Sequence, residues 1–207
     1  MALTKKLLLT VLILSCFCYE QSNCKEKSIS QSQKADLIKE ADEIIAKADS
    51  ISGTRAYPYL RIFAEVEDEP TQYVEVKDTN NWPENTITAI NVIYDEDKKP
   101  LAYIEIPISE SGDWYNVYGN YYNQEGKITV FKRYSGFFNS ECVDSVLKER
   151  TLIYYDAKFN KIDEKYELYD QSDNPVDSTG CVFYYRFDYK IYKTFSKTPL
   201  VKKRILK

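Results

Sequence analysis

The sequence contains no histidine among its 207 residues, and glycine occurs only six times. The absence of imidazole excludes catalytic triads with a histidine base and metal sites built from histidine. The few glycines form neither a phosphate-cradling loop nor the sharp turn that carries a nucleophilic serine. We therefore expect a protein that is not an enzyme and that uses no metal ion or other cofactor.

The sequence has no excess of positive charge, and no apolar run near the start is long. Acidic residues number 32 against 28 lysines and arginines, which gives a formal net charge of −4. Because binding to phosphate groups needs concentrated positive charge, we expect no nucleic-acid partner. The apolar stretch from Leu7 to Phe17 is shorter than the roughly 20 residues that a transmembrane helix needs.

The N-terminal segment has the order of an export signal. Lys5 and Lys6 precede an apolar run that ends in Ile13-Leu14-Ser15-Cys16. This order resembles the signal of bacterial lipoproteins, and the resemblance implies cleavage before Cys16 and acylation of that cysteine. It further implies a lipid-anchored protein of the bacterial cell envelope, on the periplasmic or the cell-surface face. An export signal without a lipid and a membrane-spanning helix are the alternatives.

Two further cysteines compete with Cys16 as the acylated residue. Cys18 follows the bulky Phe17, and Cys24 follows Asn23 well beyond the apolar run, whereas a small serine precedes Cys16. The leucine two positions before Cys16 departs from the family pattern, in which a smaller residue is commoner. The order of residues nevertheless favours Cys16.

Export also favours disulfide bonds. Cys142 and Cys181 both belong to the part of the chain that is expected to fold. A bond between them would close a loop of 39 residues, which is worth about 4 kcal/mol on the loop-entropy argument. The alternative is two buried free thiols that act as small apolar side chains.

The remaining chain divides into a tether and one domain. Residues 1–15 are expected to form the signal peptide, and residues 16–30 are polar without periodicity, as in a flexible tether. Residues 31–207 then form a single domain that begins with an amphipathic helix over about 31–51. Ser28 or Ser30 is expected to cap this helix, and Gly53 to end it in the left-handed conformation. The apolar stripe of the helix consists of Leu37, Ile38, Ala41, Ile44, Ile45, Ala48 and Ile51.

Beyond residue 56 the apolar pattern changes to a period of two, which predicts strands. The segment from Leu60 to Glu67 shows it clearly. The expected strands cover 60–67, 72–77, 86–94, 101–108, 113–122, 127–134, 149–156, 162–169, 181–187 and 189–195.

Four turns between these strands share one form, in which a tyrosine and then Asp or Asn precede a polar stretch. They begin at Tyr94-Asp95, Tyr122-Asn123, Tyr155-Asp156 and Tyr169-Asp170. The fold class is therefore α+β, with one N-terminal helix packed on a large curled antiparallel meander, a partial barrel. In predicted architecture alone this resembles the half-barrel of the periplasmic lipoprotein carriers.

Tyrosine is unusually abundant, with 19 copies. Neighbouring tyrosines in a strand point to opposite faces, so one face is expected to bury rings and the other to present them. Cross-strand pairing that binds nothing is the alternative. The candidate binding surface consists of Trp114, Tyr115, Tyr118, Tyr184 and Tyr185.

Three charged clusters are interpreted as ordinary surface. The run of Glu65, Glu67, Asp68 and Glu69 is expected at a solvated strand end, and the C-terminal lysines and arginine at a frayed terminus rather than on anionic head groups. The oxygen-rich segment from Asp170 to Asp177 lacks the spacing of a calcium loop and predicts a turn.

The sequence therefore favours a non-enzymatic binding or protein-interaction domain, anchored to the membrane by a lipid, with an unknown envelope protein or glycan as partner. The alternative is a periplasmic carrier of an apolar ligand, enclosed by the curled sheet. A third hypothesis, a hydrolase that uses a serine with lysine or a carboxylate pair, has no residues nominated by spacing.

Overall fold

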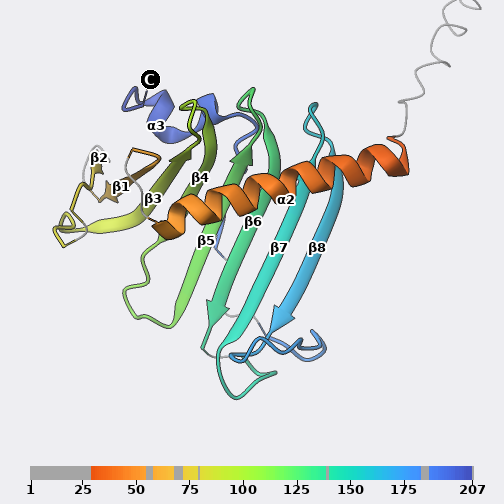
Figure 1. Ribbon diagram of the computed structural model, residues 1–207. Helices are drawn as coiled ribbons and strands as arrows, with labels where there is room; N and C mark the ends of the chain where they lie inside the picture. Colours follow the sequence, from red (N-terminus) through yellow and green to blue (C-terminus); the bar gives the residue numbers. More distant parts are fainter. Residues whose placement is uncertain are drawn as a thin grey trace, which may run out of the picture. The chain divides into compact units, whose positions relative to one another are not determined.

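The computed structural model describes residues 29–54, 58–67, 72–78, 80–138, 140–182 and 187–206 (Figure 1). The chain divides into two compact units, 1–34 and 35–207, and the sheet belongs wholly to the second. The predicted signal peptide and the predicted acylation site, Cys16, lie outside the described residues. The elements in chain order are α2 (Gln31–Thr54), β1 (Leu60–Val66), β2 (Gln72–Glu75), β3 (Thr86–Tyr94), β4 (Pro100–Pro107), β5 (Trp114–Tyr122), β6 (Ile128–Phe137), β7 (Leu147–Tyr155), β8 (Lys161–Tyr169), the 3₁₀ turn η1 (Phe195–Lys197) and α3 (Pro199–Lys202).

The eight strands form one open antiparallel sheet in the order β2-β1-β3-β4-β5-β6-β7-β8. From β3 to β8 each strand pairs with its neighbour in the chain, as Figure 1 shows, and only β2 folds back to the outer edge of β1. The prediction of an α+β fold with one N-terminal helix and an antiparallel meander is confirmed at this level.

Helix α2 begins with a capping box. The backbone N–H of Gln33 donates to Ser30 Oγ at 3.2 Å, and the backbone N–H of Ser30 donates to Gln33 Oε1 at 3.1 Å. This reciprocal pair satisfies two of the free N–H groups at the helix start. The predicted end of the helix is wrong, because the helix continues to Thr54 and includes Gly53, which does not have a positive φ.

Four turns share one hydrogen-bonding pattern. In the β3–β4 turn, a side-chain oxygen of Asp95 accepts hydrogen bonds from the backbone N–H groups of Asp97 and Lys99, at 3.0 and 2.8 Å. The backbone N–H of Asp95 donates to the carbonyl of Lys99 at 2.9 Å. The same bonds recur in the turns that begin at Asn123, Asp156 and Asp170. The form that the four predicted turns share therefore has a physical basis, because the Asp or Asn side chain accepts hydrogen bonds from the backbone of its own turn.

The fourth residue of each of these turns has a left-handed backbone. These residues are Lys98, Gly126, Phe159 and Asp173, with φ of 61°, 70°, 69° and 64°. A left-handed conformation is costly for any residue with a Cβ atom, and only one of the four is glycine. The hydrogen bonds to the Asp or Asn side chain hold the other three turns in this shape.

The strand predicted at 189–195 is wrong, because these residues contain no strand and Thr194 makes only an isolated bridge with Lys127. Of the strand predicted at 181–187, residues 183–186 lie outside the described part, and residues 181, 182 and 187 are not in a strand. The rings of Tyr189 and Tyr192 instead pack on Phe131 and Tyr103 of the sheet.

The C-terminal end is ordered as far as residue 206. Leu200 and Leu206 are buried among the same aromatic residues that Tyr192 contacts. The expectation of a frayed terminus is therefore wrong for the described residues. Apolar side chains within the basic sequence anchor α3, and the charged ends of the neighbouring lysines and arginine stay exposed.

The hydrophobic core consists of two large clusters, and alternate strand residues contribute to each. The first, here the alanine cluster, joins Ala41 and Ala48 of α2 to strand residues such as Ala102. Hydrogen bonds accompany it, from Tyr154 Oη to Asp42 at 2.8 Å and from Lys132 Nζ to Asp49 at 3.1 Å.

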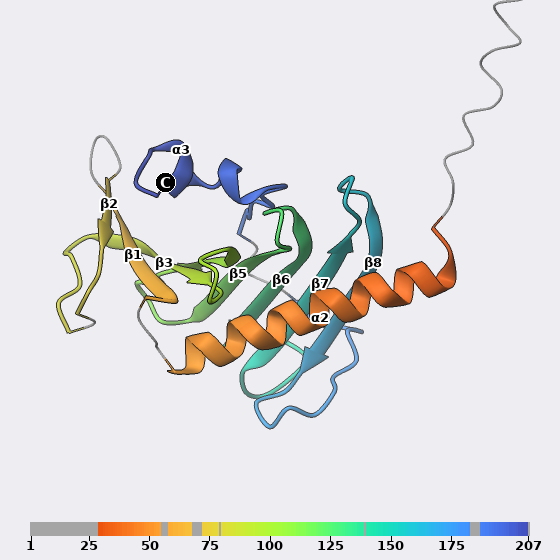
Figure 2. The ribbon, with the colours of Figure 1, turned by 45° about the horizontal axis from the view of Figure 1, so that its top comes forward.

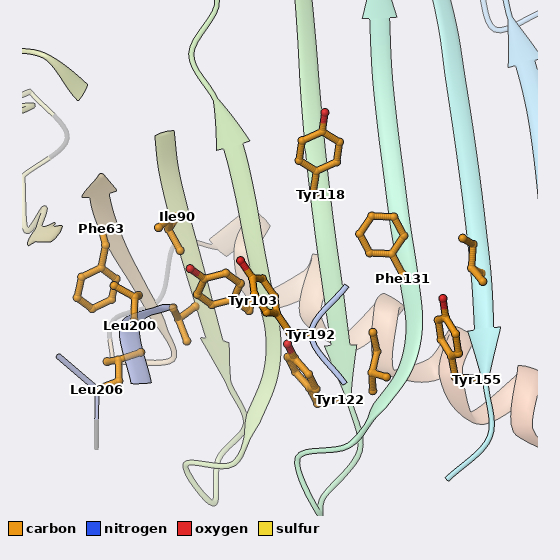
Figure 3. Packing of buried hydrophobic residues seen from close by; sticks show 13 residues of the cluster. Phe63, Ile90, Tyr103, Tyr118, Tyr122, Phe131, Tyr155, Tyr192, Leu200 and Leu206 are labelled. Carbon is orange, nitrogen blue, oxygen red and sulfur yellow. The ribbon is translucent and has the colours of Figure 1, made fainter. Parts of the chain in front are cut away.

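The second cluster, here the tyrosine cluster, lies on the other face of the sheet. It joins Tyr103, Tyr122 and Phe131 of the strands to Tyr192 and Leu200 of the C-terminal segment (Figure 3). Figure 2 shows α2 and α3 on different sides of the sheet. Residues from opposite ends of the domain thus belong to the hydrophobic clusters on the two faces of the sheet.

Candidate functional site

A polar pocket of about 550 Å³ opens on the tyrosine side of the sheet. Strands β1, β3, β4 and β5 form its floor, and the C-terminal segment forms one wall. The pocket is lined by Glu65, Thr88, Glu105, Pro107, Tyr118, Asp188, Tyr189, Lys190 and Tyr192. Its size falls within the range of small-molecule sites. We call it the Glu105 pocket.

Strand register explains how these residues meet. Glu105 lies opposite Ile90 on one side and Tyr118 on the other, and Glu65 lies opposite Thr88. Residues that lie opposite one another in a sheet share a face. The acidic groups therefore point to the same face as the rings of the tyrosine cluster.

Glu105 has the most informative ionisation in the pocket. Burial raises the pKa of this carboxyl to about 7, although the hydrogen bond from Tyr192 Oη, at 3.0 Å, acts in the opposite direction. The charge of Glu65 adds to the increase, and the ammonium of Lys190 opposes it. At neutral pH the carboxyl is therefore close to half protonated and is able both to donate and to accept a proton.

Two further tyrosines belong to the surroundings of Glu105. Tyr73 Oη donates a hydrogen bond to Glu65 at 2.9 Å, and burial raises its pKa. Tyr103 is completely buried, and its hydroxyl forms no hydrogen bond of good geometry with the described residues, although it lies close enough to Glu105 to lower the pKa of that carboxyl. After burial, the charge of Glu105 is the strongest influence that raises the pKa of Tyr103. The Tyr103 hydroxyl and the Glu105 carboxyl thus lie close together.

Cations of the chain already lie over several rings of this region. Lys190 Nζ lies 5.9 Å from the centre of the Tyr192 ring, and Arg133 lies 5.4 Å from that of Tyr189. These distances are those of cation–π contacts. The tyrosine rings around the pocket therefore present their negative faces to positive groups.

More polar atoms are buried further along the same face. Asn116, Ser135 and Thr151 are nearly inaccessible, and each has a side-chain atom without a hydrogen-bond partner. Beside them Arg133 forms an ion pair of 2.6 Å with Glu149, which is only 3 % exposed. Buried polar atoms without partners are rare in proteins, and on this face several have none among the described residues.

The predicted binding residues lie in different places. Trp114 stacks on Phe187 with ring centres 4.3 Å apart, and Tyr118 packs against Tyr189 at 5.7 Å and lines the Glu105 pocket. Tyr118 is only 4 % exposed. Tyr115 contacts Tyr134.

Tyr115 belongs to the other face of the sheet, because it alternates with Trp114. Its ring lies against Gly136, where a Cβ atom would collide with it, so it fills the space that this glycine leaves. The three described residues therefore do not form one exposed surface. Tyr184 and Tyr185 lie outside the described residues.

Cys142 and Cys181 form a disulfide bond, with Cα atoms 4.7 Å apart. This is the pair that the sequence predicts. It joins the β6–β7 connection to the start of the C-terminal segment, just before the residues that line the pocket. The bond therefore restrains one wall of the site.

Among the described residues, no group of three or more acidic or cysteine side chains is placed to hold a metal ion. In the same part of the chain, no helix is long and apolar enough to cross a membrane.

Glu65, interpreted from the sequence as part of a solvated strand end, instead lines the pocket, and the neighbouring Asp68 and Glu69 lie outside the described residues.

Sequence reasoning missed Glu105. One signal was present, because Glu105 is the single charge in the apolar strand from Leu101 to Pro107 and has the same parity as Tyr103. A lone acid at an inward position of an apolar strand indicates a buried carboxyl. Its partners Tyr192 and Lys190 come from a segment that the sequence predicts as a strand, so their proximity was not foreseeable.

Comparison with known proteins finds no matching family model, curated protein or solved structure. The pocket and the N-terminal sequence are therefore the features that bear on function.

Proposed function

We propose that this chain is a lipid-anchored protein of the bacterial cell envelope, whose domain is a non-enzymatic binding module with the Glu105 pocket as its binding site. The observation that carries the proposal is the pocket itself, in which acidic groups and tyrosine rings line one open space. Tyrosine combines apolar area with a hydrogen-bonding hydroxyl, which suits recognition of polar partners. A glycan or a protein of the envelope supplies such a partner.

We also propose that the sheet curls around α2 as a partial barrel. Support comes from the alanine cluster, in which small side chains of the helix meet strand residues. In this arrangement α2 is the permanent cover of one face, and the opposite face is left for binding.

Membrane anchoring is tested by replacing Cys16 with serine. We expect the wild-type protein in the membrane fraction, labelled by a radioactive fatty acid, and the Cys16→Ser variant in the soluble envelope fraction without label. Cys18→Ser is the matched control and should behave as wild type. An unlabelled wild-type protein would contradict the lipid anchor.

Binding is tested with variants of the pocket wall. Trp114→Ala together with Tyr118→Phe removes one ring of the Trp114–Phe187 contact and one hydroxyl of the pocket. We expect these changes to release partners that are cross-linked to the wild-type domain in whole cells. Circular dichroism checks that the variant is folded, and retention of every partner would contradict the assignment.

The alternative function, carriage of an apolar ligand, predicts a different outcome. Its binding site should be an apolar space, whereas three carboxyl groups and one ammonium line the Glu105 pocket. We therefore expect organic extraction of the purified protein to release no stoichiometric lipid. A bound lipid detected by mass spectrometry would favour the carrier.

A further inference from the structure

We propose that the Glu105 pocket binds a small organic cation, with an alkylammonium group held against the Glu105 carboxylate and the tyrosine rings. This inference rests on the proposed function, which makes the pocket the binding site, and it names the class of ligand.

The charges of the pocket favour a cation. Glu65, Glu105 and Asp188 contribute carboxyl groups, and Lys190 is the one basic residue of the lining. Tyr73 engages Glu65 by a hydrogen bond, and Tyr192 engages one oxygen of Glu105. An incoming ammonium therefore meets excess negative charge, whereas a carboxylate or phosphate would meet repulsion.

The hydroxyl of Tyr103 is a further polar group beside Glu105. It is completely buried, forms no hydrogen bond of good geometry with the described residues, and lies close enough to Glu105 to lower the pKa of that carboxyl. Figure 3 shows its ring beside that of Tyr192. A phenol oxygen accepts hydrogen bonds as well as donating them, and an ammonium carries three donors. An ammonium at the Glu105 carboxylate therefore has donors left for neighbouring tyrosine oxygens.

The walls favour an organic cation over a metal ion. Tyr118, Tyr189 and Tyr192 line the pocket, and tyrosine rings attract alkylammonium groups and contact their carbon atoms. The ammonium of Lys190 lies over the ring of Tyr192 and serves as an internal example of such binding. Because Lys190 is exposed, its side chain is free to leave when an external cation arrives.

Binding should depend on pH because a cation favours the ionised form of Glu105. Protonation of this carboxyl near neutral pH removes the negative charge that the ammonium needs. The titratable or charged groups around Glu105 come from strands β1, β2, β4, β5 and β6 and from the C-terminal segment. They are Glu65, Tyr73, Tyr103, Tyr118, Arg133, Asp188, Tyr189, Lys190 and Tyr192.

The test is a calorimetric titration of the purified full chain with three probes of equal size, n-butylammonium chloride, n-butanol and sodium butyrate. At pH 8 we expect the ammonium to bind roughly tenfold more tightly than the alcohol, as one charge-assisted contact implies, and butyrate not to bind. Between pH 8 and pH 5 the affinity for the ammonium should fall.

Three variants locate the effect. Glu105→Gln should weaken ammonium binding about tenfold and remove its pH dependence, whereas Lys190→Met should strengthen it about threefold by removing the internal cation. Glu40→Gln, at an exposed position of α2, is the matched control and should change nothing.

The outcomes distinguish failure of this inference from failure of the proposed function. Preferential binding of butyrate or butanol in the pocket would contradict a cationic ligand, but the pocket would still be a binding site. Failure of all three probes would overturn the cation, whereas the pocket as a binding site is overturned separately, if the Trp114→Ala/Tyr118→Phe variant keeps every cross-linked partner. Equal effects of Glu105→Gln and Glu40→Gln would also overturn the inference, because binding would then occur elsewhere.

Discussion

The two faces of the sheet bury different chemistry. The alanine cluster brings Ala41 and Ala48 of α2 against apolar strand residues, and its polar contacts, such as that between Tyr154 and Asp42, are satisfied. The tyrosine cluster also buries large rings, but on that face lie the Glu105 pocket and buried side-chain atoms, such as those of Asn116 and Ser135, without a hydrogen-bond partner among the described residues. The α2 face carries a pocket of about 350 Å³ as well, where Lys132 and Asp49 form an ion pair. The comparison teaches that the two faces differ in how fully their buried polar groups are paired.

The covers of the two faces differ in the same way. Helix α2 is a regular element of 24 residues, whereas residues 187–194 of the C-terminal segment form no helix or strand before η1. A disulfide and two buried leucines, Leu200 and Leu206, hold that segment. The tyrosine side should therefore be the more easily loosened of the two.

The largest effect that would sharpen this comparison is loss of the disulfide. Replacing Cys142 and Cys181 together with serine should lower the free energy of unfolding by about 4 kcal/mol, because a loop of 39 residues is no longer closed. Urea denaturation measures the loss. Hydrogen exchange should accelerate first at residues 187–194 and not in α2, and the opposite order would contradict the comparison.

The next effect concerns the buried carboxyl of Glu105. Because its pKa is raised in the folded state to about 7, its neutral form supports folding below pH 4.5, and this support is lost as pH rises through 7. Glu105→Gln should therefore match wild type at pH 4 and be more stable by about 3 kcal/mol at pH 8. Thermal denaturation at the two pH values checks this prediction. Equal stability of the two proteins at pH 8 would show that folding does not raise the pKa of this carboxyl.

A smaller effect is expected from a larger side chain in the alanine cluster. Ala48 is completely buried in the alanine cluster, so Ala48→Leu should cost about 2 kcal/mol by overpacking. Ala35→Leu, at an exposed position of the same helix, is the control and should be nearly neutral. If both variants were equally stable, the helix would not be held closely against the sheet.

The smallest effect concerns the turns, which belong to neither face. Lys98 has a left-handed backbone with φ of 61°, so Lys98→Gly should stabilise the protein by about 0.5–1 kcal/mol. Gly126→Ala, at the equivalent position of the next turn, should destabilise it by a similar amount, because an added Cβ meets no close neighbour there and only the backbone cost remains. Chemical denaturation of both variants checks the opposite signs.

Much of the fold followed from local patterns. The helix start, strands β1 to β8 and the four turns lie close to their predicted positions, because periodicity and turn residues act over a few neighbouring residues. The pair Cys142–Cys181 was also predicted, from the expected compartment and the small number of cysteines. The role of Tyr115 was not, because Gly136, which its ring covers, lies on the neighbouring strand.

The candidate site was the least predictable part. Burial raises the pKa of Glu105. That burial depends in part on the C-terminal segment, whose Tyr192 lies more than 80 residues away from Glu105 in the chain. The same segment alternates like a strand in the sequence, yet both sides of β5 are already occupied by β4 and β6, and the edges of the sheet are β2 and β8. No local pattern distinguishes a strand from a chain that crosses a face.

The amino-acid order alone determined the start of α2, strands β1 to β8, the turn chemistry and the excess of acidic over basic residues, since each depends on residue type and short spacing. Tertiary structure decided which acid is buried, which tyrosines meet and where a pocket remains. The physical reason is that burial and electrostatic coupling depend on distances in space, and Glu65, Glu105 and Lys190 become neighbours only after the chain has folded.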